Sequence, residues 1–233
     1  MKKVEIEIKS YLDMIGREYN EKFSRFQELL LEYNQRFNLT SVMAEQEILY
    51  KHFLDSLAGE SLFPQNANVV EIGSGAGFPS IPLKIAREDL SFTLIESTGK
   101  KCDFLRVAVK EMELQNVKIC NIRAEEGGKD ENFREKYDVS CARAVARLNT
   151  LAEYCMPFVK IGGQFIAYKG SAQEEITEAE HAIEILGGKV EKVLQFSLPE
   201  GMGERTLVVV RKLRATPQKY PRGRGKERSD PLL

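Results

Sequence analysis

The stretch Glu71-Ile72-Gly73-Ser74-Gly75-Ala76-Gly77-Phe78-Pro79 decides the fold of this chain. The run Val69-Val70-Glu71-Ile72 is typical of a short buried strand, and Pro79 suits the first turn of a helix. Glycines at such a strand-to-helix turn let the backbone approach a flat nucleoside and adopt positive φ. In an open parallel sheet this turn is also the favoured ligand position. The stretch therefore predicts an α/β domain that binds a nucleotide-like ligand, with a purely structural tight turn as the alternative.

The sequence on both sides extends this pattern. Downstream, apolar segments predict strands at residues 91–96, 116–122, 137–142 and 164–168, alternating with helices at 100–112, 148–159 and 174–186. This alternation predicts a parallel sheet with helices on both faces. Strands at 190–196 and 206–211 are close enough in sequence to pair antiparallel, and residues 5–62 have helical periodicity. We therefore expect a helical extension over residues 1–64, a ligand-binding domain over 65–213 and a basic tail over 214–233.

Composition narrows the functional classes. The 233 residues carry a formal net charge of −1, so the whole chain has no strong bias toward nucleic acid. The charge is uneven, because residues 211–228 hold eight Lys or Arg and a single acid, Glu227. No apolar run reaches the roughly 20 residues of a membrane span, and the first residues do not resemble a secretory signal. We expect a soluble cytoplasmic protein without membrane association.

The cysteines and histidines give no metal-binding pattern. The four cysteines lie far apart without a C-x-x-C pair, and only two histidines accompany them: Cys102, Cys120, Cys141, Cys155, His52 and His181. Three of the cysteines stand in apolar surroundings, where small buried thiols are common. We predict reduced cysteines and no metal site.

The details of the glycine turn distinguish between ligands. A dinucleotide fingerprint would place its third glycine at position 78, where this chain has Phe78, whereas the third glycine comes one residue early at Gly77. Glu71 lies in the strand just before the turn, where a carboxylate would repel a pyrophosphate and suit a cationic ligand. Gly73, Gly75, Gly77 and Glu71 therefore favour S-adenosylmethionine as the cofactor.

Acids after the next two strands agree with this ligand. Glu96 ends the second strand, 23 residues after Gly73, close to the spacing of an acid that hydrogen-bonds ribose hydroxyls. Ala124 and Glu125 follow the third strand, where they can meet the adenine edge. A solvated loop acid is the alternative for each glutamate.

The motifs together resemble a known family. The further motifs are Asn38-Leu39-Thr40-Ser41, His52-Phe53-Leu54-Asp55-Ser56-Leu57, Arg143-Ala144-Val145-Ala146, Tyr168-Lys169-Gly170 and Tyr220-Pro221-Arg222. With the glycine turn, they resemble the ribosomal RNA small subunit methyltransferase G family, also called the glucose-inhibited division protein B family, over nearly the whole chain. The resemblance implies a Rossmann-like class I methyltransferase fold, with a mostly parallel seven-stranded sheet and an antiparallel last strand.

The resemblance also implies an activity. Family members transfer the methyl group of S-adenosylmethionine to N7 of a guanine in 16S rRNA, leaving S-adenosylhomocysteine. The implied partner is 16S rRNA, as the small ribosomal subunit or an assembly intermediate, with no obligate protein partner evident. Two alternatives stay open: a methyltransferase for a small molecule or protein, and a ribosome-assembly factor that binds S-adenosylmethionine without turning it over.

The family's cofactor contacts can be placed on this chain. They fall on Gly73, Phe78, Glu96, Ser97, Thr98, Ala124, Glu125 and Arg143. Phe78 and Arg143 come from the resemblance alone. Neither histidine lies at a predicted strand end, which suits a guanine N7 acceptor, because N7 has a free lone pair and no proton to remove. We expect Arg143 and Lys169, at the ends of the fourth and fifth strands, to position the guanine or its phosphate; solvated surface cations are the alternative.

The basic tail is the predicted RNA contact. Its candidate cations are Arg211, Arg214, Lys219, Arg222 and Arg224, with Tyr220 as a possible stacking surface. The tail departs from the family pattern, since Glu227 and Ser229-Asp230 replace a further proline and lysines. We expect deletion of residues 216–233 to weaken RNA binding and leave cofactor affinity nearly unchanged. For His52 and Asp55, a capping or packing role is at least as plausible as substrate contact.

Overall fold

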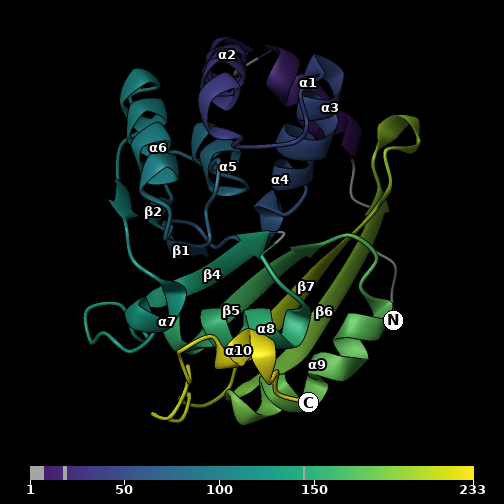
Figure 1. Cartoon of the computed structure of the whole chain (residues 1–233). Coiled ribbons are helices and arrows are strands. Elements are labelled where there is room, and N and C mark those ends of the chain that lie inside the picture. Colours follow the sequence, from purple (N-terminus) through teal and green to yellow (C-terminus); the bar gives the residue numbers. More distant parts are fainter. Residues whose placement is uncertain (1–7, 18–19, 144) are drawn as a thin grey trace.

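A seven-stranded sheet organises the molecule (Figure 1). The computed structural model describes residues 8–17, 20–143 and 145–233. The strands are β1 (Asn68–Ile72), β2 (Ser91–Ile95), β3 (Val117–Cys120), β4 (Tyr137–Arg143), β5 (Val159–Lys169), β6 (Gly188–Ser197) and β7 (Glu204–Lys212). Their order is β3-β2-β1-β4-β5-β7-β6, and β7 is antiparallel to both of its neighbours while the pairs from β3 to β5 are parallel. The expected mostly parallel sheet with an antiparallel last strand is confirmed.

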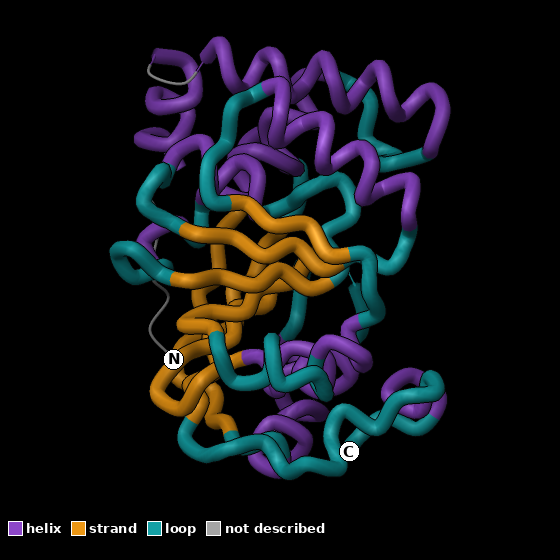
Figure 2. The backbone as a smooth tube through the Cα atoms, turned by 90° about the vertical axis from the view of Figure 1, so that its left-hand side faces the viewer, coloured by secondary structure: helices purple, strands orange, loops and turns teal. Residues whose placement is uncertain are grey.

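Helices cover both faces of the sheet, as Figure 2 shows. On one face lie α1 (Ile8–Arg17), α2 (Asn20–Phe37), α3 (Glu45–Ile48), α4 (Asp55–Leu57), α5 (Ser80–Ala86) and α6 (Gly99–Glu111). On the other lie α7 (Ala124–Gly127), α8 (Leu148–Cys155), α9 (Gln173–Ile185) and α10 (Lys226–Ser229). A π-helical segment, η1 (Leu49–Leu54), joins α3 to α4. Short 3₁₀ turns are η2 (Glu60–Leu62), η3 (Met156–Phe158) and η4 (Pro199–Gly201). Within the described ranges, no helix is both long and apolar enough to cross a membrane.

Alternating strand residues divide the core into two layers. Val69 packs under the N-terminal helices, whereas Val70 packs against α8 and α9, because successive side chains of a strand point to opposite faces. Helix α8 ends at Cys155, earlier than the expected 159, since Pro157 disfavours continuing the helix and Val159 already begins β5. All four cysteines are free, and Cys120 alone among them is only partly buried; the expectation of reduced cysteines agrees with this.

The N-terminal helices share a core with the sheet. Phe26 of α2 is fully buried, with its ring centroid 5.3 Å from that of Phe78 and 6.3 Å from that of Phe104 on α6. Phe53 of η1 joins this cluster, its centroid 5.8 Å from that of Phe26. Aromatic clusters of this kind bury large apolar areas. The extension is therefore packed directly over the turn that follows β1.

The C-terminal tail is packed into the fold. Arg134 donates hydrogen bonds to the backbone carbonyl oxygens of Thr216 and Tyr220, at 2.7 and 2.9 Å. Arg222 pairs with the buried carboxylate of Glu153 at 2.8 Å. The Tyr220 side chain is 5% exposed, so its ring is unavailable as the stacking surface suggested by the sequence. Buried charges need such partners, and these hold the tail in place.

Candidate active site

The glycine turn, residues 73–77, closes the carboxyl end of β1. Gly73, Gly75 and Gly77 have φ values of +70°, +56° and +85°, a region that residues with a side chain rarely adopt. A Cβ at Gly77 would lie 2.4 Å from Cγ1 of Ile81, and one at Gly73 would lie 2.8 Å from Cγ2 of Val145. Glycine is therefore required at these positions by the backbone conformation, and at Gly73 and Gly77 also by close packing.

Glu96 connects the glycine turn to the segment after β2. Its Oε2 accepts a hydrogen bond from the Gly75 amide at 3.0 Å, and its Oε1 accepts one from the Thr98 amide at 2.7 Å. Each carboxylate oxygen keeps a second lone pair. The side chain is 6% exposed and faces a cavity, so ligand hydroxyl groups there can still donate to it.

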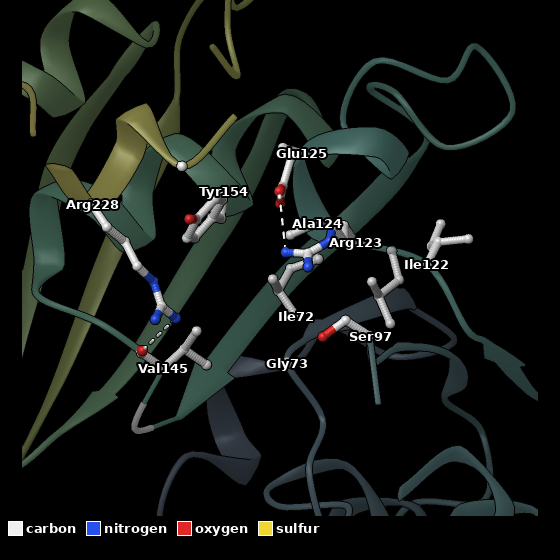
Figure 3. Close-up of a pocket in the computed structure, with 12 residues that line it drawn as sticks. Ile72, Gly73, Ser97, Ile122, Arg123, Ala124, Glu125, Val145, Tyr154 and Arg228 are labelled. Atoms are coloured by element: carbon white, nitrogen blue, oxygen red, sulfur yellow. Dashed lines mark hydrogen bonds and ion pairs between the residues drawn. The ribbon is translucent and has the colours of Figure 1, made fainter. Parts of the chain in front are cut away.

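Two adjoining cavities lie along these elements. The first has a volume of about 310 Å³ and an apolar lining from Ile72, Ile95 and Ile122, with Ala124 and Glu125 at one end (Figure 3). The second has a volume of about 530 Å³ and is lined by Leu39, Thr40, Ser41, Val42, His52, Gly73, Ser74, Gly75, Ala76, Phe78, Glu96, Ser97, Thr98, Lys101, Arg143, Val145 and Arg228. Four residues line both: Gly73, Ser97, Val145 and Arg228. Both cavities have mixed linings of apolar and polar groups, and two adjoining cavities of this kind suit a nucleoside with a charged extension.

Most of the predicted cofactor residues line these cavities. They are Gly73, Gly75, Phe78, Glu96, Ser97, Thr98, Ala124, Glu125 and Arg143. Gly77 is not on either wall and serves the turn itself. The fold therefore brings together predicted residues from the ends of four strands, β1 to β4.

Glu71 differs from the sequence expectation. Its side chain is fully buried beneath the glycine turn and lines neither cavity. Burial raises the pKa of Glu71 to about 8, and the charge of Arg143 offsets only part of this rise. Neither carboxyl oxygen has a hydrogen-bond partner among the described residues. The carboxyl group is thus mostly protonated at pH 7, so it does not offer the cavity the negative charge that its position in the sequence suggested.

Arg143 is the centre of a polar cluster at the end of β4. It donates from Nη1 to the carbonyl oxygen of Lys51 at 2.9 Å and to Oδ2 of Asp55 at 3.0 Å. Its Nη2 lies 3.0 Å from Nδ1 of His52, and its guanidinium carbon lies 4.8 Å from the ring centroid of Phe78. These four contacts hold the side chain in one orientation.

His52 is neutral in this cluster. Burial lowers its pKa to about 3, and the charge of Arg143 adds to this effect. Because a guanidinium group can only donate, Nδ1 accepts from Arg143, and the tautomer carries its proton on Nε2, which lies 2.9 Å from Oγ1 of Thr40. The imidazole stacks on Phe78 with centroids 4.4 Å apart. The π-helical segment η1 places it there, and such segments frequently occur at functional sites.

A third cavity of about 320 Å³ lies on the other side of Arg143. Asp55 is 5% exposed there and bridges Arg143 to Arg205 of β7, with Oδ1 lying 3.4 Å from Nε of Arg205. Lys169 lines the same cavity and pairs with Glu175 at 2.8 Å. Arg143 and Lys169 therefore face one cavity as expected, and each has a carboxylate partner. Arg205 was missed from sequence, because only the sheet order brings β7 beside β5.

The predicted RNA-contacting cations fall into two groups. Arg211 pairs with Glu191 at 2.8 Å, and Arg222 pairs with Glu153 and Asp230. Arg214, Lys219 and Arg224 are exposed and carry no ion pair among the described residues. Arg228, which the sequence analysis did not select, instead lines the first two cavities. Across the described ranges, no group of three or more His, Cys, Asp or Glu is placed to hold a metal ion.

Comparison with known proteins gives consistent matches. A family model described as rRNA small subunit methyltransferase G matches residues 19–208. The ribosomal RNA small subunit methyltransferase G of Brevibacillus brevis is 47% identical over 216 residues, 91% of this chain and 91% of that protein. The Acetivibrio thermocellus protein of the same name is 45% identical over 216 residues, 91% and 88% of the two chains. That of Staphylococcus aureus is 44% identical over 230 residues, 97% and 96% of the two chains.

Solved structures agree on the fold. A precorrin-6y C5,15-methyltransferase from Geobacter metallireducens has a TM-score of 0.55 at 15% identity, covering 74% of this chain and 91% of that one. An S-adenosylmethionine-dependent O-methyltransferase from Thermotoga maritima has a TM-score of 0.54 at 13% identity, covering 81% and 73%. At these identities the likeness shows the fold alone, and it confirms the Rossmann-like class I methyltransferase fold.

Proposed function

This chain belongs to the rRNA small subunit methyltransferase G family, and on that premise we propose that it transfers a methyl group from S-adenosylmethionine to N7 of a guanine in 16S rRNA. The resemblance drawn from its motifs is confirmed. The substrate is 16S rRNA within the small ribosomal subunit or an assembly intermediate, and the reaction takes place in the cytoplasm, where these particles form. The product of the cofactor is S-adenosylhomocysteine.

The observation that best supports the proposal is the pair of adjoining cavities across the glycine turn. In the first cavity, the side chains of Ile72, Ile95 and Ile122 offer apolar surface to an adenine ring, and Ala124 and Glu125 can meet its polar edge. Glu96 has lone pairs free for the two ribose hydroxyls. The backbone of Gly73 is bare of side chain where the two cavities meet, so the methionyl chain can pass close to it. Ser97, Thr98 and Phe78 complete the cofactor contacts that we propose.

The acceptor lies on the far side of Arg143 in this proposal. The third cavity begins there, and its cationic groups, Arg143, Lys169 and Arg205, suit guanine O6 and the RNA phosphates. When bound, S-adenosylmethionine supplies an electrophilic methyl group. The N7 lone pair attacks that methyl carbon while the S–C bond breaks and its electron pair stays on sulfur. No proton leaves N7, so the neutral His52 has no proton to accept, and positioning dominates the rate.

The direct test is the location of the methyl group. Ribosomes from a strain lacking the protein should lack one N7-methylguanine in 16S rRNA by mass spectrometry, and expression of this chain should restore it. An E96A variant, weakened at the ribose, should not restore it. Full N7-methylation in the deletion strain would refute the proposed acceptor.

A reconstituted reaction separates the alternatives. The purified protein is supplied with S-adenosylmethionine and either naked 16S rRNA, 30S subunits, an assembly intermediate or an RNA-free cell extract, and S-adenosylhomocysteine is measured. Product that forms only with RNA supports the proposal and identifies the preferred particle. Product formed without RNA indicates a small-molecule or protein acceptor, and cofactor binding with no product in any mixture indicates an assembly factor.

A further inference from the structure

The C-terminal segment, residues 213–233, returns to the face of the sheet that carries α8. Oγ1 of Thr150 on α8 donates to the carbonyl oxygen of Glu227 at 2.8 Å, and Nδ2 of Asn149 donates to that of Leu232 at 3.1 Å. The Glu227 carboxylate is fully buried and accepts a hydrogen bond from the Gly223 amide. These contacts fix α10 against α8 at the rim of the first cavity.

Arg228 projects from α10 to the junction of the two cofactor cavities. Figure 3 shows its guanidinium group directed toward Val145, and Nη2 lies 3.4 Å from the Val145 carbonyl oxygen. Arg228 and Val145 belong to both cavity walls together with Gly73 and Ser97. The phenol of Tyr154 also interacts with the Arg228 side chain. A cation from the last residues of the chain thus lies where the proposed cofactor would pass from one cavity to the other.

Arg228 differs from the other arginines on these walls in its partners. Arg143 is held by Asp55 at 3.0 Å, and Arg123 lies 3.8 Å from Glu125. Among the residues that the structure describes, no carboxylate lies within ion-pair distance of Arg228. A guanidinium group left without an anion at the wall of a cavity is available to an anionic ligand group.

We propose that Arg228 binds the α-carboxylate of S-adenosylmethionine and makes the C-terminal segment part of the cofactor site; this inference rests on the proposed function. At neutral pH the cofactor carries a sulfonium and an ammonium group, both of which repel a guanidinium group, and one anion, the carboxylate. The two oxygens of that carboxylate match the guanidinium fork. The segment therefore serves the cofactor through Arg228, whatever its exposed lysines and arginines do for RNA.

Two ligands that differ only at the amino-acid end give the test. S-adenosylhomocysteine has the carboxylate, whereas 5′-methylthioadenosine has the same adenosine and a thioether but no amino acid. Titration calorimetry should show that R228A weakens S-adenosylhomocysteine binding about tenfold, which is about 1.4 kcal/mol, and leaves 5′-methylthioadenosine binding unchanged. R228K should retain part of the affinity because it keeps the charge and loses the fork.

The matched control is K226A, which removes one positive charge from the same short helix at an exposed residue outside both cavity walls. It should bind both ligands like the wild type. K101A tests the rival cation on the wall of the second cavity. An amino-acid-dependent loss in K101A and none in R228A would overturn the proposal.

Other results of the same titrations would assign Arg228 a different role. Equal losses for both ligands in R228A, with R228K no better, would show that Arg228 supports the cavity and not the carboxylate. Unchanged S-adenosylhomocysteine binding with weaker RNA methylation would assign Arg228 to RNA. If the wild-type protein binds neither ligand, the proposed function fails as well; wild-type binding with an unaffected R228A overturns this inference alone.

Discussion

His52 and Arg143 meet at 3.0 Å between Nδ1 and Nη2, and both contact the ring of Phe78 at the edge of the glycine turn, the imidazole by stacking and the guanidinium group as a cation over the ring. The contact joins the N-terminal helices to the end of β4, two parts of the chain that are 91 residues apart. It lies between the second cavity, assigned to the cofactor, and the third, assigned to the acceptor. Several consequences of this arrangement can be measured.

The first prediction concerns the contribution of Arg143 to rRNA methylation. R143A removes the guanidinium group between the two cavities, and we expect kcat/KM for rRNA methylation to fall about a hundredfold, the loss typical of misplaced reactants. R147A is the control, because Arg147 is exposed and pairs with Glu178 outside the cavities. Unchanged methylation and unchanged cofactor affinity in R143A would remove Arg143 from the site.

The second prediction uses the low pKa of His52. Burial lowers this pKa from 6.5 to about 3. Between these pH values His52 is protonated in the unfolded chain and neutral in the folded chain. The stabilising contribution is therefore complete above pH 6.5 and is lost as pH falls toward 3. Between pH 6.5 and 5.5 the wild type should lose about 1 kcal/mol more stability than H52N, whose side-chain oxygen can still accept from Arg143. Urea unfolding of both proteins at the two pH values measures the difference, and parallel curves would contradict a neutral His52.

The third prediction has the opposite sign and concerns Glu71. Burial raises its pKa from 4.5 to about 8, so between these values the folded chain keeps a proton that the unfolded chain releases. Stability from this group is complete below pH 4.5 and falls as pH rises toward 8. Relative to the wild type, E71Q should gain about 1 kcal/mol for each pH unit between 6 and 8. Unfolding at pH 6, 7 and 8 tests this; a difference that does not change with pH would mean that Glu71 is ionised when buried.

How much of the fold and of the site the sequence predicts depends on whether the pattern is local or joins distant parts of the chain. The glycine turn and the strand-helix alternation are local, and the fold that they predict is confirmed. The residues predicted around Gly73 and Glu96 line the cavities, and their contact with the cofactor stays a prediction. Arg205 and Arg228 reach the site only through the insertion of β7 between β5 and β6 and through the return of the tail along α8. No local pattern encodes those approaches. The spacing of His52 and Asp55 on one helical face was the available signal for the Arg143 cluster, and it is equally typical of simple packing.

The fourth prediction separates backbone conformation from packing in the glycine turn. In G77A the new Cβ would lie 2.4 Å from Ile81 Cγ1 at a φ of +85°, so the turn must move, and S-adenosylhomocysteine binding should fall below detection. The control is G201A, which has a φ of +68° and open space around the added Cβ. G201A should cost only the left-handed conformation, about 1 kcal/mol of stability, and should bind the ligand normally. Normal binding by G77A would show that the glycine turn does not shape the cofactor site.

The last prediction tests the tail as an RNA contact, now restricted to its unpaired cations. Arg211 and Arg222 are held by carboxylates, whereas Arg214, Lys219 and Arg224 are exposed without an ion pair among the described residues. Each phosphate contact releases counterions. Replacing the three exposed cations with Gln should therefore make the negative slope of log K against log salt for rRNA binding less steep by about 2. S-adenosylhomocysteine affinity should not change, since none of the three lines a cofactor cavity.

Deleting residues 216–233, by contrast, should weaken binding of both rRNA and S-adenosylhomocysteine, because it also removes Arg228 and the partners of Arg134 and Glu153. This reverses the expectation from sequence that a truncated chain would keep its cofactor affinity, and a truncated, folded protein with wild-type S-adenosylhomocysteine binding would restore it.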